Sequence, residues 1–304
     1  MIHGIINVYK EKGYTSHDAV ARLRKITGQK KIGHTGTLDP QAEGVLPICL
    51  GRATKLSGML TDRDKCYETV LLLGVRTDTQ DIFGKVLREE ETEGLTESLV
   101  ENVVRSFIGE YEQIPPMYSA LKVNGKKLYE LAREGKTVPR KARKAQIYDI
   151  SILETELPRV RMRVHCSKGT YIRTLCSDIG EKLGTGGCME SLIRTKAGVF
   201  AIEDSLTLQE IEKGAEDGRL TEILHPIDQM FSGYRSVTVK GEGERLAYNG
   251  NSLPEEYILW GQMPENLENF RVYDRKGEFI GIFRYEEEQK RLAIVKMFYS
   301  GERD

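Results

Sequence analysis

The chain has 304 residues, of which 39% are apolar and 30% charged, a composition typical of a globular protein of about two domains and unlike that of a disordered or fibrous chain. Its longest apolar stretches fall far short of the ~18 residues that a membrane span requires, so no membrane association is expected. The first residues lack a basic lead and a cleavage site, and five cysteines without a Cys-x-x-Cys pair fit reduced thiols. We therefore expect a cytoplasmic protein.

The net charge of −1 conceals an uneven distribution. Residues 1–200 carry 32 Lys and Arg against 25 Asp and Glu, whereas residues 201–304 carry 13 against 21. Within 117–173 the imbalance is larger, with 14 basic and 5 acidic side chains. A polyanion such as nucleic acid would balance this local field, and a solvated basic surface without a ligand is the alternative.

The first elements alternate between strand and helix. Residues 4–9 predict a strand, and a helix is expected over 16–27, where Thr15 and Asp18 have capping-box spacing and Gly28 stands just past the C-terminal end. The loop over 33–40 is too rich in Gly and Pro for a regular element. Further strands are expected at about 45–50, 67–75 and 85–88, and a helix over 96–108.

The rest of the chain predicts more strands than helices. Residues 113–144 are loop-like around a short helix at 127–133, and a second helix begins near Tyr171 and ends at Gly184. From about residue 224 the sequence becomes acidic and rich in turns, which indicates a small β-rich second domain. The strand candidates are 147–156 and 159–166, joined as a hairpin, and 270–273, 279–284 and 291–297.

The loop over 33–40 is the sharpest local feature. Pro40 keeps Asp39 away from the α region, and two glycines permit turns that other residues resist, so the loop can present a carboxylate at a fixed angle. An ordinary Asp-Pro turn beside a surface His34 is the alternative. The loop carries neither Gly-x-x-x-x-Gly-Lys-Ser/Thr nor Gly-x-Gly-x-x-Gly, which disfavours nucleotide binding.

The strand over 159–166 alternates apolar side chains with three arginines and His165. We expect Glu154 and Glu156, across the hairpin, to pair with these cations, and contact with RNA is the competing explanation. Arg173 lies off the apolar stripe of its helix, as an exposed arginine commonly does. Tyr67 begins an apolar strand, where it serves either as an interface aromatic or as a ring on which a base stacks.

Metal and hydrolase sites are not supported. The spacings of His165, Cys166, Cys176 and Cys188 match none of the short Cys/His pairs of structural zinc sites. A Ser/His/Asp hydrolase of the Gly-x-Ser-x-Gly type is excluded because that sequence does not occur. We expect no metal site.

Several segments, taken together, resemble the bacterial TruB-type tRNA pseudouridine synthases, which isomerise the T-loop uridine at tRNA position 55. The resemblance covers roughly residues 4–228 and includes Gly33-His34-Thr35-Gly36-Thr37-Leu38-Asp39-Pro40. The matching segments share their order with the family, and this order is the specific signal. They are 4–16, 33–40, 44–47, 51–55, 65–67, 74–81, 113–122, 166–175 and 225–228.

The resemblance implies an α+β protein with two domains. Residues 1–230 would form a catalytic domain of the pseudouridine synthase fold around a mixed, mainly antiparallel sheet, with an RNA-clamping loop at about 116–145. Residues 231–304 would form a small C-terminal β-rich domain of the PUA-like, RNA-binding type, although the charge of −8 over residues 201–304 disfavours a broad phosphate contact. The expected partner is the T-arm of tRNA, and we expect a monomer without an obligatory protein partner.

The resemblance also implies roles for individual residues. Asp39 is the catalytic carboxylate, Tyr67 stacks on the target base, and Arg173 pairs with Asp39. His34 occupies the space that the flipped nucleotide leaves. The other expected substrate-binding residues are Lys10, Gly36, Thr37, Leu38, Lys122, Tyr171, Leu192 and Arg194.

Two positions depart from the family pattern. The family usually has Lys-Pro where this chain has Lys10-Glu11, which bears on how the early turn packs against the Asp39 loop. It usually has Lys-Arg-Tyr where this chain has Lys65-Cys66-Tyr67, which removes a phosphate contact. Neither departure touches the carboxylate.

The expected reaction breaks a glycosidic N–C bond and rejoins the base through carbon without a redox change, so it requires no cofactor. Asp39 either attacks the sugar or removes a ribose proton through a glycal, and the sequence leaves both routes open. Two other functions compete: a non-catalytic RNA-binding or RNA-folding factor, a role that can also coexist with catalysis, and a guide-RNA-dependent synthase subunit. Asp39, Tyr67 and Arg173 together count against the first, and the complete basic segment at 116–144 counts against the second.

Overall fold

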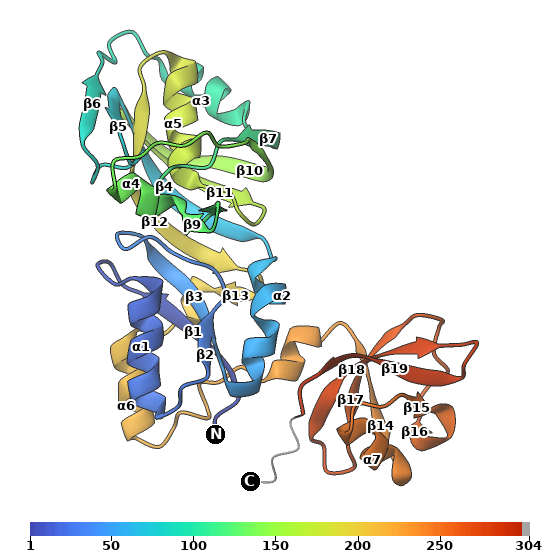
Figure 1. Ribbon diagram of the computed structural model, residues 1–304. Helices are drawn as coiled ribbons and strands as arrows, with labels where there is room; N and C mark the ends of the chain where they lie inside the picture. The colour runs from blue at the N-terminus through green and yellow to red at the C-terminus, as the bar shows by residue number, and fades with distance from the viewer. Residues whose placement is uncertain (300–304) are drawn as a thin grey trace.

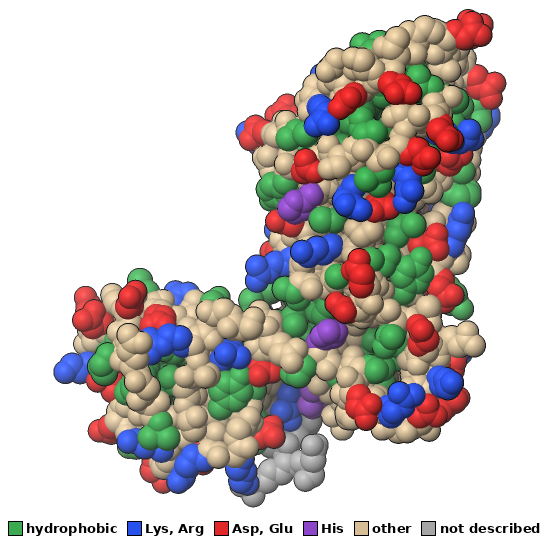
Figure 2. Space-filling model, turned by 180° about the vertical axis from the view of Figure 1, so that it is seen from behind, with side chains coloured by type: hydrophobic (Ala, Val, Ile, Leu, Met, Phe, Trp, Pro, Cys, Tyr) green, Lys and Arg blue, Asp and Glu red, His purple; other side chains and the backbone are tan. Residues whose placement is uncertain are grey.

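The computed structural model describes residues 1–299 and contains a nine-stranded and a six-stranded sheet. The larger sheet fills the tall part of the molecule, and the smaller sheet projects to the side at its foot, which gives the molecule an L shape (Figure 1). Seen from behind, acidic and basic side chains are intermingled over the tall part (Figure 2). This α+β architecture, with a β-rich C-terminal part, confirms the predicted fold class.

The larger sheet is mixed and mainly antiparallel. Its strands run in the order β1-β3-β12-β4-β11-β10-β7, with β2 beside β3 and β13 beside β12, and only β3 and β12 pair in parallel. The strands are β1 (Gly4–Lys10), β2 (Ile32–His34), β3 (Glu43–Leu50), β4 (Lys65–Leu73), β7 (Gly109–Gln113), β10 (Arg143–Glu156), β11 (Arg159–Cys166), β12 (Gly187–Ala197) and β13 (Phe200–Ala201).

The helices of this part are short and capped as the sequence predicts. Thr15 and Asp18 form the capping box of the first helix, and Gly28 and Gly184 adopt the left-handed conformation after the first and fifth. No helix within residues 1–299 is long and apolar enough to cross a membrane. The helices are α1 (Ser16–Thr27), α2 (Ser57–Thr61), α3 (Glu97–Arg105), α4 (Leu128–Arg133), α5 (Ile172–Leu183) and α6 (Leu208–Glu216), with 3-10 turns at Gly51–Leu56, Ile202–Asp204 and Ile227–Phe231.

Two small hairpins stand outside the larger sheet. The first pairs β5 (Val75–Thr77) with β6 (Val86–Glu89). The second pairs β8 (Lys122–Val123) with β9 (Lys126–Lys127), within the segment that the sequence predicts to be loop-like.

The C-terminal sheet has its own core, which contains the buried side chains of Phe270, Phe283 and Leu292. All three strands predicted there are present to within about two residues. A second apolar cluster joins this part to the larger sheet, since Ile5 and Cys49 share it with Ile282 and Phe298. The elements are β14 (Arg235–Val239), α7 (Glu242–Tyr248), β15 (Leu253–Pro254), a 3-10 turn (Glu255–Tyr257), β16 (Ile258–Leu259), β17 (Asn269–Tyr273), β18 (Phe279–Glu286) and β19 (Arg291–Met297).

The central strand β12 is the main element that the sequence did not predict. Its pairing with β4 shifts register between Met189 and Ser191 and again between Arg194 and Lys196. Each bulge interrupts the two-residue alternation by which a strand is recognised. The loop prediction over 33–40 was also partly wrong, because its first two residues belong to β2.

The predicted partners of the basic strand were wrong. Arg161 and Arg163 pair with Glu68 on β4, and Arg159 pairs with Glu190 on β12. Arg163 lies directly opposite Glu68 in the β11–β4 register. In the β10–β11 register Glu154 does lie opposite Arg161 and Glu156 opposite Arg159, but these two guanidinium groups pair with Glu68 and Glu190 instead. The cations of β11 therefore find their counter-charges on the other side of the strand, and much of their field is neutralised within the sheet.

Gly44 is required where β3 pairs in parallel with β12. Its φ is +101°, and a Cβ there would lie 2.3 Å from the carbonyl oxygen of Arg194. At Gly28 φ is also positive, at +65°, but a Cβ would meet nothing within 4 Å. A substitution at Gly28 therefore measures the cost of a left-handed backbone alone, whereas one at Gly44 measures that cost together with a steric clash.

We expect Gly44→Ala to lower the free energy of unfolding by about 3 kcal/mol or more, because strain and overpacking add. The matched control Gly28→Ala is expected to cost about 1 kcal/mol. Urea unfolding followed by circular dichroism measures both. Equal losses in the two variants would show that the close β3–β12 contact at Gly44 tolerates a methyl group.

Candidate active site

Asp39 lies in the connection between β2 and β3, and hydrogen bonds fix this loop on both sides of the carboxylate. Leu38 N donates to Ser16 Oγ at 2.9 Å, and Ser16 Oγ donates back to Leu38 O at 3.2 Å. On the other side, Gly13 N donates to Pro40 O at 2.8 Å. The start of α1 and the turn after β1 therefore hold Asp39 in place.

Lys10 ties the same loop to the turn after β1. Its side chain is fully buried, and its ammonium donates to the carbonyls of Tyr14 at 2.6 Å, Glu11 at 3.1 Å and Pro40 at 3.3 Å. Burial lowers the pKa of Lys10 to about 8. Lys10 was expected to bind substrate, but its described bonds all go to backbone oxygens of its own chain.

Arg194 holds the loop from the side of the sheet. It is 1% exposed, and its guanidinium donates to Val45 O at 2.7 Å, Gly36 O at 3.3 Å and Thr37 O at 3.5 Å. Gly36 and Thr37, both expected to bind substrate, thus accept hydrogen bonds from Arg194 through their backbone carbonyls. Charge-assisted hydrogen bonds from a buried guanidinium make this clamp rigid.

Arg173, on the first turn of α5, reaches the carboxylate. Its Nε lies 2.9 Å from Asp39 Oδ2, while Nη1 donates to Thr79 O at 3.1 Å and Nη2 to Tyr118 O at 2.8 Å. The Arg173 side chain is 5% exposed and that of Asp39 is 39% exposed. The guanidinium is therefore enclosed by protein, whereas the carboxylate it holds faces open space.

A second carboxylate, Asp81, lies on the other side of Arg173, with Oδ2 3.9 Å from Nη1. Its Oδ1 accepts from Thr79 Oγ1 at 2.7 Å and from Phe83 N at 3.0 Å. Desolvation raises the pKa of Asp39 above its usual range and Asp81 acts in the same direction, while Arg173 and Lys10 oppose them. The acidity of Asp39 is thus set by desolvation together with three neighbouring charges.

Tyr67 lies on β4 directly opposite Arg194 of β12 and Val164 of β11. Leu192 lies two residues before Arg194, on the same face of β12. Tyr67 is 9% exposed, and burial raises the pKa of its phenol, which Arg194 opposes. The phenol is therefore protonated at neutral pH and can donate a hydrogen bond.

His34 and Tyr171 flank this centre. His34 is half-buried against the edge of His17, and burial lowers its pKa, so its ring is neutral at pH 7. Tyr171 caps α5; its backbone N donates to the Gln113 side chain at 2.7 Å, and its carbonyl accepts from the same amide at 2.9 Å. Lys122 lies in the β8–β9 hairpin, and its described contacts include neither Asp39 nor Arg173.

The sequence analysis missed three residues that contact Arg173 behind the carboxylate. Asp81, Thr79 and Tyr118 were noted only as parts of longer matching segments, yet all three meet Arg173. Two of them act through backbone carbonyls, which no side-chain pattern reveals. Asp81 has a usable signal, since it is an acidic residue of a polar turn, but its direction toward Arg173 depends on the fold.

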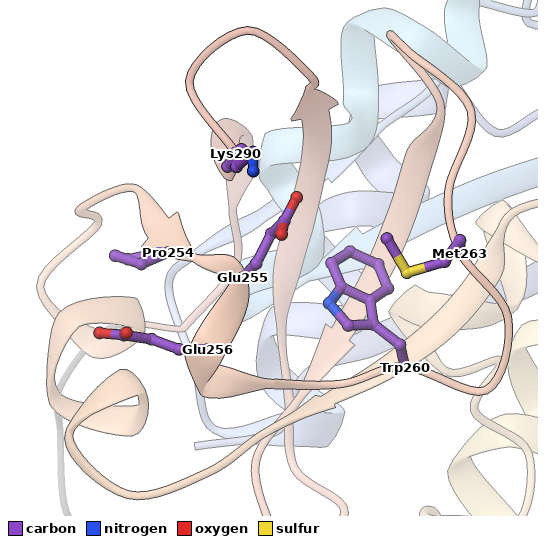
Figure 3. A pocket seen from close by; sticks show the side chains of 6 residues that line it. All are labelled: Pro254, Glu255, Glu256, Trp260, Met263 and Lys290. Carbon is purple, nitrogen blue, oxygen red and sulfur yellow. The ribbon is translucent and has the colours of Figure 1, made fainter.

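A separate pocket lies on the C-terminal sheet and contains none of the predicted site residues. Figure 3 shows the indole of Trp260 beside Met263, with Glu255 facing them. Its lining residues are Pro254, Glu255, Glu256, Trp260, Met263 and Lys290. Within residues 1–299 no group of three or more His, Cys, Asp or Glu side chains is placed to hold a metal ion.

Two family descriptions match consecutive parts of the chain. Residues 24–172 match the N-terminal domain of the TruB family pseudouridylate synthases, and residues 173–232 match the tRNA pseudouridylate synthase B C-terminal domain. The chain is 52% identical to the tRNA pseudouridine synthase B of Lachnoclostridium phytofermentans, over 98% of this chain and all of that protein. It is 44% identical to the enzyme of the same name from Alkaliphilus oremlandii, over 99% and 100%.

Solved structures of similar fold include chains from an H/ACA RNP and from a Cbf5-Nop10-Gar1 complex. A chain of an H/ACA RNP bound to a substrate RNA containing 2′-deoxyuridine superposes with a TM-score of 0.71 at 25% identity, covering 98% of this chain and 85% of that one. A chain of a Cbf5-Nop10-Gar1 complex gives 0.70 at 28% identity, covering 97% and 84%.

Proposed function

The chain belongs to the TruB family of pseudouridine synthases, and from this premise we propose that it converts the T-loop uridine at position 55 of tRNA to pseudouridine. It is an isomerase that acts on a uridine of tRNA. The observation that carries the assignment is the Asp39–Arg173 pair, in which an exposed carboxylate is held by an enclosed guanidinium. We assign residues 1–230 to catalysis and 231–304 to RNA binding.

Asp39 is the group that acts on the target nucleotide. The uridine must leave its stack, at a cost of a few kcal/mol, before its glycosidic bond is accessible. An ionised carboxylate then either attacks the sugar or removes a ribose proton, and both routes begin with Asp39 in its charged form. The loop anchors at Ser16, Gly13 and Lys10 keep this carboxylate from moving when RNA enters.

The neighbouring side chains would receive the everted base. Tyr67 and Leu192 offer an aromatic and an aliphatic surface on adjacent strands, which replace part of the stacking that the base loses. As a neutral phenol, Tyr67 also supplies a proton donor beside the ring. We assign Lys10 and Arg194 to positioning, because both hold the Asp39 loop through backbone carbonyls. His34, also neutral, takes the place of the everted base in the stack.

Two basic surfaces are suited to the phosphates of the RNA. The segment over 116–145 joins the site through Tyr118, whose carbonyl accepts from Arg173, and exposes Lys122 on its hairpin. At the junction with the C-terminal sheet, Lys31, Arg52 and Lys296 all act on Lys55 to lower its pKa, after desolvation. Such a cluster allows local contacts by a domain whose overall charge is negative.

The two competing functions are weaker. A non-catalytic RNA-binding factor has no need for a catalytic carboxylate held beside a buried arginine, although a tRNA-folding role is compatible with catalysis. The solved structures of similar fold described above belong to multi-component assemblies, but the relatives at 52% and 44% identity that match nearly the whole chain are named tRNA pseudouridine synthase B. We therefore propose that the protein acts alone, as a monomer.

We expect purified protein to form pseudouridine at position 55 of an unmodified tRNA transcript, without guide RNA, and Asp39→Asn to abolish product while binding tRNA normally. The amide keeps the size of the carboxylate but removes its charge. Pseudouridine mapping and a filter-binding assay measure the two quantities. Tight binding by the unsubstituted protein without product would make it a binding factor, and product at another uridine would correct the target.

Arg173→Lys should lower single-turnover product formation about 10- to 100-fold with little change in tRNA affinity. A point-like ammonium retains the charge but not the three-way fork to Asp39, Thr79 and Tyr118. Arg163→Lys, on an exposed arginine paired with Glu68, is the matched control and should retain wild-type turnover. Equal single-turnover rates for Arg173→Lys and Arg163→Lys would show that Arg173 has no specific role in catalysis.

Asp81→Asn should move the acid limb of the pH–rate profile to lower pH. Activity requires ionised Asp39 and is lost as the pH falls through its raised pKa; removal of the Asp81 charge lowers that pKa, so the ionised form persists to lower pH. The amide Oδ1 can still accept from Thr79 and Phe83. An acid limb that stays in place or moves upward would contradict this coupling.

A further inference from the structure

The β5–β6 hairpin exposes apolar side chains beside the candidate active site. Ile82 is 38% exposed, Phe83 51%, Val86 48% and Leu87 64%. Aromatic side chains are ordinarily buried for most of their surface because each carries a large apolar area. A half-exposed phenylalanine two residues from Asp81 therefore calls for a partner.

Phe83 is coupled to the carboxylate through short contacts. Its backbone N donates to Asp81 Oδ1 at 3.0 Å, and Asp81 lies 3.9 Å from Arg173, which holds Asp39. In addition, Ile82 N donates to Met189 O at 3.0 Å on the central strand β12. The aromatic ring thus stands on a backbone that is fixed to the same framework as the site.

The turn after β1, on the other side of the site, contacts the Phe83 ring through Lys12. The Lys12 ammonium lies 5.4 Å from the centroid of Phe83, and the next residue, Gly13, donates to Pro40 O at 2.8 Å. Contacts therefore form a closed circuit from Asp39 through Arg173, Asp81, Phe83 and Lys12 back to Pro40. Phe83 and Lys12 meet across the rim of the Asp39 site.

We propose that Phe83 and Lys12 form a subsite for a nucleotide next to the everted uridine, an inference that rests on the proposed function. The base stacks on the exposed part of the Phe83 ring, and its phosphate pairs with the Lys12 ammonium. Aromatic stacking is how proteins hold unstacked bases of RNA, and lysine binds phosphate as a point charge. Eversion of one base leaves its neighbours unstacked, so such a surface stabilises the open loop.

The chemistry of the subsite favours RNA over a protein partner. An apolar docking surface needs no cation above its central ring, whereas a nucleotide presents both a flat base and a negative charge. Leu87, on the same hairpin, is more exposed than Phe83 but lacks a ring and a described cation contact. It therefore provides a matched control for loss of apolar surface alone.

The test compares T-arm hairpin RNAs that are intact or carry an abasic ribose on the 5′ or the 3′ side of the target, bound to full-length protein with Asp39→Asn to prevent turnover. Adding Phe83→Leu should weaken binding of the intact hairpin on the order of tenfold. The loss should disappear with one of the two abasic hairpins. Phe83→Tyr, which restores a ring, and Leu87→Ala should bind within about twofold of the parent.

The phosphate contact has a separate readout. Lys12→Gln should reduce the slope of log affinity against log salt concentration by about 1, as expected for one lost phosphate contact. An unchanged slope would remove Lys12 from the subsite. The midpoint temperature of thermal unfolding is measured for each variant, and a midpoint equal to that of the parent shows that the fold is intact.

Two binding results would overturn the subsite: affinity unchanged by Phe83→Leu, or an equal loss with the intact and both abasic hairpins, which would assign the ring to the fold or to a protein surface. Product formation by the unsubstituted protein reports independently on the proposed function. If the unsubstituted protein forms product but Phe83→Leu leaves binding unchanged, only the proposed subsite is refuted. If no product forms but the binding losses follow the predicted pattern, only the proposed activity is refuted.

Discussion

The geometry of the site depends on one ion pair whose two partners have opposite environments. Arg173 is enclosed and donates to three acceptors, only one of which is Asp39. Because Thr79 and Tyr118 fix the guanidinium through backbone carbonyls, its position does not depend on the carboxylate. Asp39 can therefore engage a substrate while the cation that favours its charged form stays in place. Desolvation and the Asp81 charge act against that cation and raise the pKa of Asp39.

The loop that carries Asp39 owes its rigidity to buried cations rather than to regular structure. Lys10 and Arg194 are both almost completely enclosed, and burying an unpaired charge is costly unless its hydrogen bonds are satisfied. Here the loop's own carbonyls satisfy them, including Pro40 O, Gly36 O and Thr37 O. A loop that moved away would leave the cations without acceptors, which links the conformation of residues 36–40 to the stability of the sheet beneath. A less ordered loop would present the same carboxylate over a range of angles and lose much of its effect on a bound sugar.

Sequence patterns predicted the parts of this molecule that follow regular periods. The capped helix over 16–27, the hairpin around Leu157–Pro158 and the strands after residue 269 all follow from local signals. Strand β12 was not predicted because its two bulges break the two-residue alternation of side chains. The contacts of Asp81 and Tyr118 with Arg173 were not predicted because they arise only when distant segments meet. The family resemblance supplied Asp39 and Arg173, which the residues alone left open between a turn and a site. It assigned Lys10 to the substrate, whereas the contacts of its ammonium indicate a role within the loop.

Charge counts along the chain overstate the unpaired positive charge on the surface of the basic segment. The arginines of β11 account for part of the basic excess over 117–173, yet Glu68 and Glu190 pair with them from outside that window. What remains is the exposed part of the segment over 116–145, together with cations contributed by other segments, such as Lys12 and the junction group around Lys55. An electrostatic surface is a property of the folded sheet, in which a strand's nearest counter-charge sits on a neighbour far away in sequence. For the same reason an acidic C-terminal domain can border an RNA-binding surface, since only the charges at its junction with the larger sheet would need to be positive.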